Sequence, residues 1–205
     1  MAVTSLWRVK GYIGKVVMYA INPDKTTEPV SYQTDAVSDG AEDTLGGIVS
    51  YVGRDEATNQ KSLVYGICCH KDTAVQDMMA VKRKFEKTDG VIAYHGYQSF
   101  AEGEVTPDTA HEIGKALAKE LWGNRYQVLI TTHLDKDSHI HNHFVINTVS
   151  YVDGKKYHRT KQDYYRMREV SDRLCKEYGL SVIEKPKTKG KSYAEWKAEF
   201  EGRPT

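Results

Sequence analysis

The sequence has few cysteines and no long apolar run. Its three cysteines, Cys68, Cys69 and Cys175, form no CxxC pair, and two adjacent cysteines suit reduced thiols better than a disulfide framework. No run approaches the roughly 18 apolar residues of a transmembrane helix, and the first residues lack the apolar core of a secretory signal. We therefore expect a cytoplasmic protein with reduced cysteines that does not insert into a membrane.

Net charge is also small, at a formal +1, but it is unevenly distributed. Residues 151–205 contain 14 Lys and Arg against 9 Asp and Glu, whereas the residues before them contain 15 against 19. Twelve of the cations lie between residues 155 and 191. Such a basic run can follow a phosphate backbone if its side chains share one face, although a solvated helix surface gives the same count.

Strand and helix patterns alternate irregularly along the chain. Apolar, β-branched runs predict strands at 48–52, 63–69, 91–100, 126–133, 141–150 and 180–184. Apolar stripes with helical spacing predict helices over 10–22, after Thr73, after Thr106 and up to Gly179. Thr73 and Gln76 also have the spacing of a capping box. Because the strands are joined by hairpins rather than regular βαβ units, we expect an antiparallel α+β sandwich.

The last twenty residues differ from the rest in composition. The stretch KPKTKGKS is typical of a linker, and a helix that begins near Ser192 ends in EGRPT without an evident packing partner. We therefore expect one compact domain over residues 1–185, and over 186–205 a linker and the start of a C-terminal extension of a longer protein.

Four of the eight histidines lie in the stretch THLDKDSHIHNHFVIN. Alternation along a strand places His139, His141 and His143 on one face, and His133 can approach them across the hairpin. Three imidazoles on two strands leave open positions on a divalent metal, as catalytic sites require. Four imidazoles could instead close a structural site, with His139 as the fourth ligand.

The ligand type limits the metal without naming it. Imidazoles bind Zn, Mn, Ni, Co and Fe. Asp135 and Asp137, in the link between the two strands, could orient imidazole N–H groups, or they could serve only as turn residues.

The run H-x-D-x-D followed by H-x-H on a strand resembles the third motif of the conjugative relaxases. These are mobilisation nucleases of the histidine-hydrophobic-histidine superfamily, and the resemblance is to their P-type (MOBP) branch. The stretch KVVMYAINPDKT resembles the first motif and contains Tyr19. The stretch YHGYQSFAEGEVTPDTAHEIG, centred on Ser99, resembles the second motif of relaxases on Gram-positive conjugative transposons. Together the motifs cover most of residues 5–160.

This resemblance implies a fold and a reaction. The fold is a central antiparallel sheet of about five strands flanked by helices, in a two- or three-layer sandwich. The domain would bind an origin of transfer as a single strand beside a hairpin, cleave one strand and remain on the 5′ end through Tyr19. Accessory DNA-binding and coupling proteins of a conjugation system would be its partners.

The resemblance also selects site residues. It implies a divalent metal, Mn or Mg in function with Zn, Ni or Co possible, bound by His133, His141 and His143. His139-Ile140-His141 fits the superfamily pattern literally, whereas His141 and His143 enclose a polar residue, so His139 is retained as an alternate ligand.

The DNA-binding candidates fall into two groups. Gln98 and Ser99 lie in the second motif, where contact with DNA near the scissile phosphate is implied. Lys155, Lys156 and Arg159 follow the metal-bearing strand and could contact phosphates.

The nucleophile has its own arguments and alternatives. Tyr19 lies off the apolar stripe of its predicted helix. An activated tyrosine can attack a phosphodiester and keep its bond energy in a covalent product. A metal hydrolase in which three histidines activate water is one alternative. Another is a replication initiator of the same superfamily, for which Tyr164 and Tyr165 lie downstream of the histidines.

Overall fold

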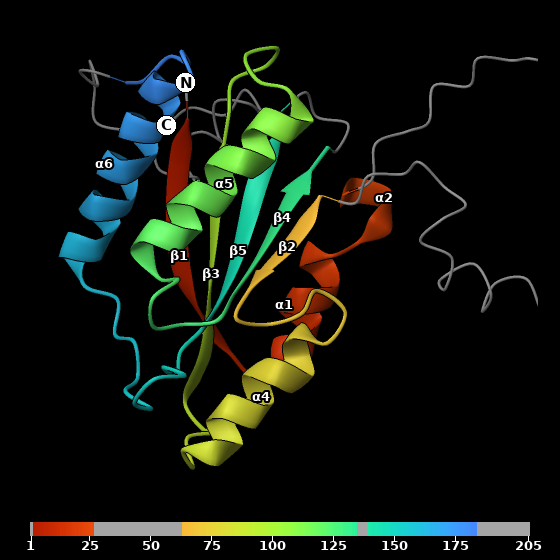
Figure 1. The fold of residues 1–205 in the computed structure, drawn as a ribbon, viewed down its shortest axis with the longest axis vertical. Coiled ribbons are helices and arrows are strands. Elements are labelled where there is room, and N and C mark those ends of the chain that lie inside the picture. Colours follow the sequence, from red (N-terminus) through yellow and green to blue (C-terminus); the bar gives the residue numbers. More distant parts are fainter. Residues whose placement is uncertain (1, 27–62, 135–138, 184–205) are drawn as a thin grey trace, which may run out of the picture.

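The computed structural model describes residues 2–26, 63–134 and 139–183. Figure 1 shows its elements. In chain order they are β1 (Val3–Lys10), α1 (Ile13–Ala20), α2 (Pro23–Thr26), β2 (Val64–Ile67), α4 (Ala74–Lys84), β3 (Val91–Ser99), α5 (Pro107–Leu121), β4 (Val128–His133), β5 (His141–Asn147) and α6 (Lys161–Glu177).

The strands form one five-stranded sheet in the order β1-β3-β5-β4-β2. Every pair of neighbouring strands is antiparallel. The hairpin partners β4 and β5 therefore lie inside the sheet, and β1 and β2 form its edges. This arrangement confirms the expected antiparallel α+β fold.

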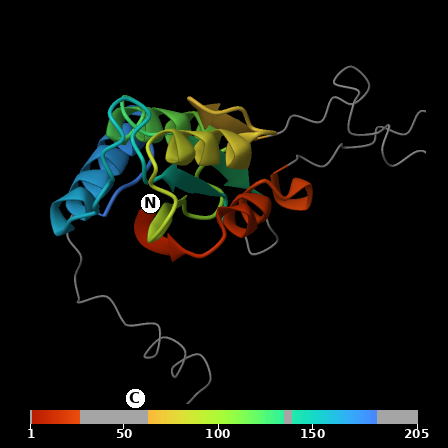
Figure 2. The same cartoon turned by 90° about the horizontal axis from the view of Figure 1, so that it is seen from below.

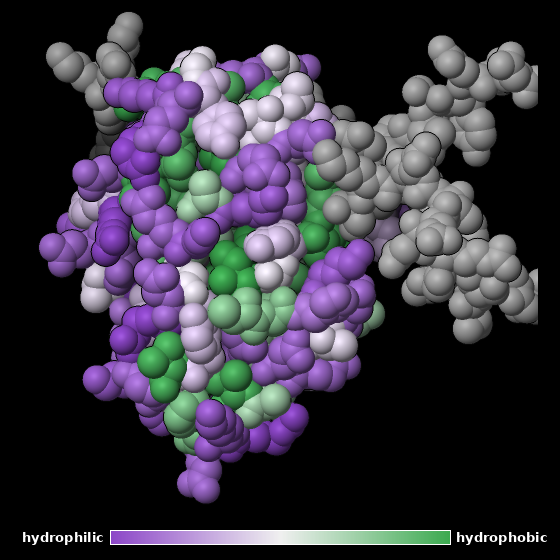
Figure 3. Space-filling model, viewed as in Figure 1, coloured by the Kyte–Doolittle hydropathy of each residue, from purple (hydrophilic) through white to green (hydrophobic). Residues whose placement is uncertain are grey.

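Helices cover both faces of the sheet, which makes three layers (Figures 1 and 2). On one face, α5 and α6 pack over a core that includes Tyr94, Ile130 and Phe144. On the other, α1 and α4 pack over a second core that includes Ala93 and Leu129. Because side chains alternate along each strand, neighbouring residues of one strand belong to different cores. The side of the molecule that carries α5 is mostly hydrophilic in the space-filling view, as expected for amphipathic helices (Figure 3).

Side chains cap the starts of α5 and α6 but not the start of α4. The Thr106 side chain accepts a hydrogen bond from the Thr109 N–H, ahead of a proline in the first turn of α5. A capping box that had not been predicted joins Thr160 and Asp163 at α6. The predicted box at Thr73 is wrong, because that hydroxyl bonds the Asp77 carboxylate and no side chain caps the helix.

One other prediction is wrong, and two concern residues outside the described ranges. The predicted strand at 180–184 is wrong over residues 180–183, which form no strand; there the Ser181 N–H bonds the Glu104 carboxylate, 2.5 Å away, instead of a neighbouring strand. The predicted strand at 48–52 and the extension at 186–205 fall outside the described residues. In the part of the chain that is described, no helix has the length and apolar character needed to cross a bilayer.

Candidate metal centre and nucleophile

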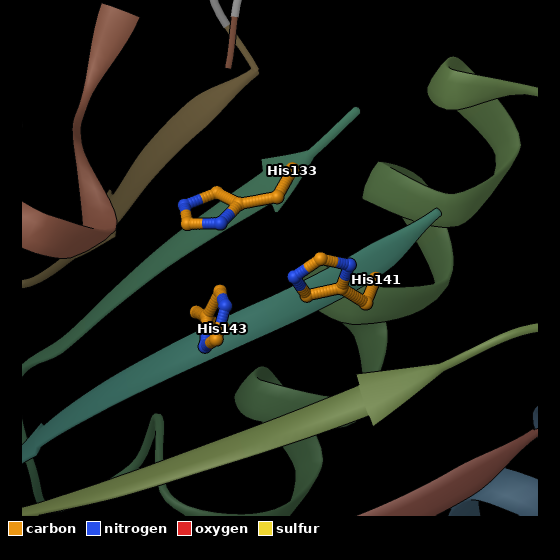
Figure 4. A group of neighbouring side chains, drawn as sticks. All are labelled: His133, His141 and His143. Atoms are coloured by element: carbon orange, nitrogen blue, oxygen red, sulfur yellow. The ribbon is translucent and has the colours of Figure 1, made fainter. Parts of the chain in front are cut away.

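Three imidazoles meet where the central hairpin begins and ends. His133 is the last residue of β4 and is paired with His141, the first residue of β5. His143 lies two residues further along β5 and so on the same face. One nitrogen from each ring lies within 4.8 Å of the others, and the group could hold a metal ion. Figure 4 shows the three rings gathered beside the two strands.

The other ring nitrogen of each histidine already has a hydrogen-bond partner. His133 Nε2 donates to the Ala20 carbonyl oxygen at 2.8 Å, and His141 Nδ1 donates to the His139 carbonyl oxygen at 2.8 Å. Because a carbonyl oxygen only accepts, these bonds fix the tautomers and leave His133 Nδ1 and His141 Nε2 as the lone-pair atoms. Partners of this kind orient metal-binding imidazoles.

His143 has the clearest character of a metal ligand. The residue is 6% exposed, and its Nε2 is buried without a hydrogen-bond partner among the described residues. Burial, reinforced by the neighbouring imidazoles, lowers the pKa of His143 to about 2, so the ring is neutral at physiological pH. A buried lone pair with no donor costs free energy unless a ligand satisfies it. The donor set therefore fits a divalent metal.

A fourth histidine, His95, contributes to the cluster without being one of the three candidate ligands. It lies on β3 with its Nε2 3.0 Å from His143 Nδ1. Burial, with a contribution from His133, lowers the pKa of His95 to about 4. Sequence reasoning missed His95. Strand alternation could have placed it on a face with Tyr97 and Ser99, but only the pairing of β3 with β5 brings that face to the metal centre.

His139, the alternate ligand, is not part of the three-histidine cluster. The His139 side chain is exposed, and the metal-competent cluster found among the described residues does not include it. Its backbone carbonyl orients His141 instead. Asp135 and Asp137 lie outside the described residues.

Tyr19 lies beside the histidines, in the last turn of α1. The helix buries Ile13 and Val17 against the sheet and leaves Tyr19 47% exposed. The Tyr19 ring centroid is 5.4 Å from that of His143 and 5.6 Å from that of His133. The bond from His133 to the carbonyl of Ala20, the next residue after Tyr19, connects this end of α1 to the candidate metal site.

A cation that sequence reasoning also missed lies over Tyr19. The Lys25 ammonium is 5.0 Å from the centroid of the Tyr19 ring. Lys25 belongs to α2, the short helix that follows α1 directly. The Lys25 ammonium thus places positive charge next to Tyr19, which favours an anionic group such as a phosphate there.

The two candidate DNA contacts of the second motif have different positions. Ser99 ends β3, is half-buried and is paired with His141. Gln98 is fully buried, donating to Ser171 at 2.7 Å and accepting from Asn142 at 3.0 Å. The prediction that Gln98 contacts DNA is corrected, because its side chain is buried on the sheet face that packs against α5 and α6, opposite the histidines.

The polar residue between the two β5 histidines belongs to the same buried network. Asn142 faces away from the metal site and donates to the Ala110 carbonyl oxygen at 2.7 Å, and its own oxygen accepts from Thr132 at 2.7 Å. Asn142 therefore links β3, β4, β5 and α5 directly beneath the histidines, which explains the departure from the apolar residue of the superfamily pattern.

The three basic candidates are not brought to the histidines. Lys155 and Lys156 follow the opposite end of β5, about 20 Å along a seven-residue strand from His141. Lys156 Nζ there donates to the Asp89 carbonyl oxygen at 2.9 Å. Arg159 bonds the Leu6 carbonyl, and its N–H donates to the Tyr94 hydroxyl, so it lies among residues of the α5–α6 side.

The tyrosines of the replication-initiator alternative are also remote. Tyr164 and Tyr165 lie in the first turns of α6, which packs on the sheet face opposite the histidines through Met167 and Leu174. Among the described residues, Tyr19 is the tyrosine whose ring contacts the three histidines.

Comparison with known proteins identifies relatives of this chain. The family described as "Relaxase: MobA/VirD2-like, nuclease domain" matches residues 51–180. A "Protein rlx" of Staphylococcus aureus is 40% identical over 120 residues, which are 58% of this chain and 38% of that protein. The "Group II intron-interrupted relaxase LtrB" of Lactococcus lactis subsp. cremoris is 28% identical over 206 residues, covering 80% of this chain and 36% of that protein. The chain thus spans well under half the length of these relatives.

A solved structure shares the fold. The MobM relaxase domain (MOBV), in a Mn-bound crystal structure with plasmid pMV158 oriT DNA, has a TM-score of 0.55 and 13% sequence identity, covering 97% of this chain and 98% of that chain. At this identity the likeness concerns the fold alone. Because the family match includes the histidine cluster and covers more than half of the sequence, the chain belongs to the MobA/VirD2-like relaxases and contains their nuclease domain.

Proposed function

We propose that this domain nicks and rejoins one strand of DNA at an origin of transfer, through attack by Tyr19 on the scissile phosphate. The observation that carries the proposal is the packing of the Tyr19 ring, 5.4 Å between centroids, against His143, a member of the three-histidine cluster. A tyrosine and a metal-competent cluster side by side suit phosphoryl transfer.

His133, His141 and His143 would hold the metal ion. When bound, a divalent ion, Mn or Mg in function, supplies positive charge to the non-bridging oxygens of the phosphate. The chain's own contribution is to keep the His143 imidazole neutral by burial, which lowers its pKa, and to orient the three rings through Ala20, His139 and His95. Zn, Ni or Co would suit the same nitrogen ligands.

The proposed reaction conserves the phosphodiester energy. The Tyr19 hydroxyl oxygen forms a bond to phosphorus, and the bond from phosphorus to the 3′ oxygen breaks. The products are a 5′-phosphotyrosine and a free 3′-hydroxyl, and the proton lost by the tyrosine is balanced by the one gained at the 3′ oxygen. The reverse attack by the 3′-hydroxyl reseals the strand. No external energy source is required.

Finer features of the proposal follow from the motifs and the relatives. We place the domain in the P-type (MOBP) branch, since its first, second and third motifs resemble that branch. The substrate would be single-stranded DNA beside a hairpin, and the partners would be accessory DNA-binding and coupling proteins of a conjugation system. Ser99, next to His141, remains the proposed DNA contact from the second motif. The free cysteines suit a cytoplasmic location.

The test is covalent capture of DNA. The protein is incubated with Mn²⁺ and 3′-labelled single strands tiled across the DNA beside its gene, and the products are resolved on denaturing gels. A labelled band of protein mass that needs metal, disappears in Tyr19→Phe and persists in Tyr12→Phe is the expected result. Tyr12 is a matched control because it is exposed and precedes the same helix. Cleavage that survives Tyr19→Phe without an adduct would instead indicate the water-activating hydrolase.

A further inference from the structure

A pair of aromatic side chains, one exposed and one half-buried, lies on the sheet face that carries the histidines. Trp7 on β1 is 41% exposed, and Tyr97 on β3 is half-buried. Their ring centroids are 6.0 Å apart, with the planes inclined at 58°. We call Trp7 and Tyr97 the aromatic shelf.

The shelf is continuous with the candidate active site. Trp7 is paired with His95 across β1 and β3, and their ring centroids are 4.6 Å apart. The ring centroid of His95 in turn lies 6.2 Å from that of Tyr19. Tyr97 is paired with His143 on the neighbouring strand. A series of ring contacts thus runs from the proposed nucleophile, through the buried His95, to Trp7 on the edge strand of the sheet.

The position of Trp7 is unusual for a side chain of its size. The second core, formed by α1 and α4, includes Val9 from β1 but not Trp7. An indole of which two fifths is exposed contributes only part of its possible burial to stability. Exposed aromatic surface beside a reaction centre is therefore better explained by a ligand than by packing.

The local charge selects an anionic ligand. The Lys25 ammonium lies 5.0 Å from the centroid of the Tyr19 ring, on the side of the sheet that carries the histidines, whereas Arg8, the residue after Trp7 in β1, faces the other side of the sheet. A cation beside exposed aromatic rings is a combination that binds single-stranded nucleic acid, in which cations neutralise phosphates and rings stack on bases.

We propose that the aromatic shelf is a stacking subsite for unpaired nucleobases next to the phosphate that Tyr19 attacks. The inference rests on the proposed function in that its ligand is single-stranded DNA. The inclined planes of Trp7 and Tyr97 form a corner, so a base stacked on one ring meets the other ring at an angle. The bound DNA strand consequently bends at the aromatic shelf. Stacking tolerates every base, so the shelf holds the strand without specifying its sequence.

The test distinguishes binding through the bases from binding through the phosphates. Binding of a fluorescein-labelled dT strand of about 12 nucleotides is compared with binding of an abasic strand of the same length, in EDTA and in a Tyr19→Phe background. Trp7→Ala is expected to weaken binding of the dT strand about tenfold and to leave binding of the abasic strand unchanged. Trp7→Phe should retain most of the affinity. Tyr178→Ala is the matched control, since Tyr178 is 47% exposed and lies just after α6.

Several outcomes would overturn the proposal. They are equal binding of the two strands by the parent protein, absence of binding to the dT strand, and equal weakening of both strands by Trp7→Ala. A lower melting temperature with unchanged DNA affinity would show that Trp7 instead packs against another part of this chain. Because the assay needs neither metal nor cleavage, a failure of the Tyr19 mechanism leaves its result readable, and the gel assay for the adduct remains readable if the shelf fails.

Discussion

His95 and His143 share a hydrogen bond of 3.0 Å between ring nitrogens, and both rings are nearly buried. When His143 presents Nε2 to a metal, its Nδ1 carries a proton that His95 Nε2 accepts. His95 therefore acts as a positioning residue, which selects the tautomer of a ligand without touching the ion. Partners of this kind are typically worth 10–100-fold in metal affinity.

We expect His95→Phe to weaken Mn²⁺ binding by roughly 10–100-fold, because His143 loses the acceptor for its Nδ1 proton. His95→Gln, which keeps an acceptor oxygen, should recover a large part of the affinity. The measurement is Mn²⁺ titration followed by electron paramagnetic resonance, with the melting temperature of each metal-free variant as the control for folding. Equal losses in the two variants would contradict a tautomer-selecting role.

Lys82, in the last turn of α4, is a buried titratable residue outside the candidate metal centre. Its side chain is fully buried, and its ammonium donates to the Thr148 hydroxyl at 2.9 Å. Burial, with a contribution from Lys156, lowers the pKa of Lys82 from 10.5 to about 8. Between these pH values the unfolded chain holds more protons than the folded one, so this residue makes the unfolding free energy increase as pH rises.

Lys82→Met should therefore be more stable than the parent at pH 7, where the folded parent buries a charge. Its advantage should shrink by roughly 3 kcal/mol by about pH 10.5, because the pKa of Lys82 is lowered from 10.5 to about 8 in the folded protein. Urea unfolding of both proteins at the two pH values measures the difference, in which the titration of other groups cancels. A difference that does not change with pH would refute the assigned pKa.

At the scale of elements, α5 approaches the sheet closely at one glycine. A Cβ built on Gly114 would lie 2.6 Å from Asn142 Nδ2. Asn142 cannot retreat without breaking its hydrogen bonds to Gln98, Ala110 and Thr132. The helix and the metal-bearing strands are thus fitted to each other through this contact.

Gly114→Ala should lower the unfolding free energy by about 1–3 kcal/mol, because overpacking outweighs the gain in helix propensity. The matched control is Gly14→Ala in α1, where the new Cβ meets the ring of Tyr12. That side chain is 65% exposed and can move into solvent, so we expect a neutral or stabilising change. Chemical denaturation of both variants checks the prediction, and similar losses in the two would contradict it.

The sequence indicated the parts of the site that depend on local periodicity. His133, His141 and His143 are near in sequence, and strand alternation across one hairpin brings them together. Alternation could also have separated Gln98 from Ser99, since adjacent strand residues face opposite sides. His95 and Trp7 could not be placed, because their positions depend on strand order. The distance of Lys155 from the histidines likewise follows from the length and direction of β5. A count of charges in the sequence contains no information on either.

At the scale of the whole molecule, the metal centre is built on a sheet that is complete without it. The candidate ligands lie on β4 and β5, which pair with each other and with β3 and β2. Their second nitrogens are hydrogen-bonded to the protein. A site prepared in this way contributes to stability only through binding, in contrast to structural zinc modules whose folding requires the metal.

We therefore expect the protein in EDTA to keep its circular dichroism spectrum and to unfold cooperatively. Mn²⁺ at about 100 times its dissociation constant should add about 2.7 kcal/mol, which raises the melting temperature by roughly 5–10 °C. His141→Ala should abolish this increase with little change in the metal-free protein, since His141 is the least buried of the three ligands. His139→Ala should keep the increase, because its side chain lies outside the cluster. Unfolding by EDTA alone, or loss of the increase in His139→Ala, would indicate a closed four-histidine structural site, which has no open position for a phosphate.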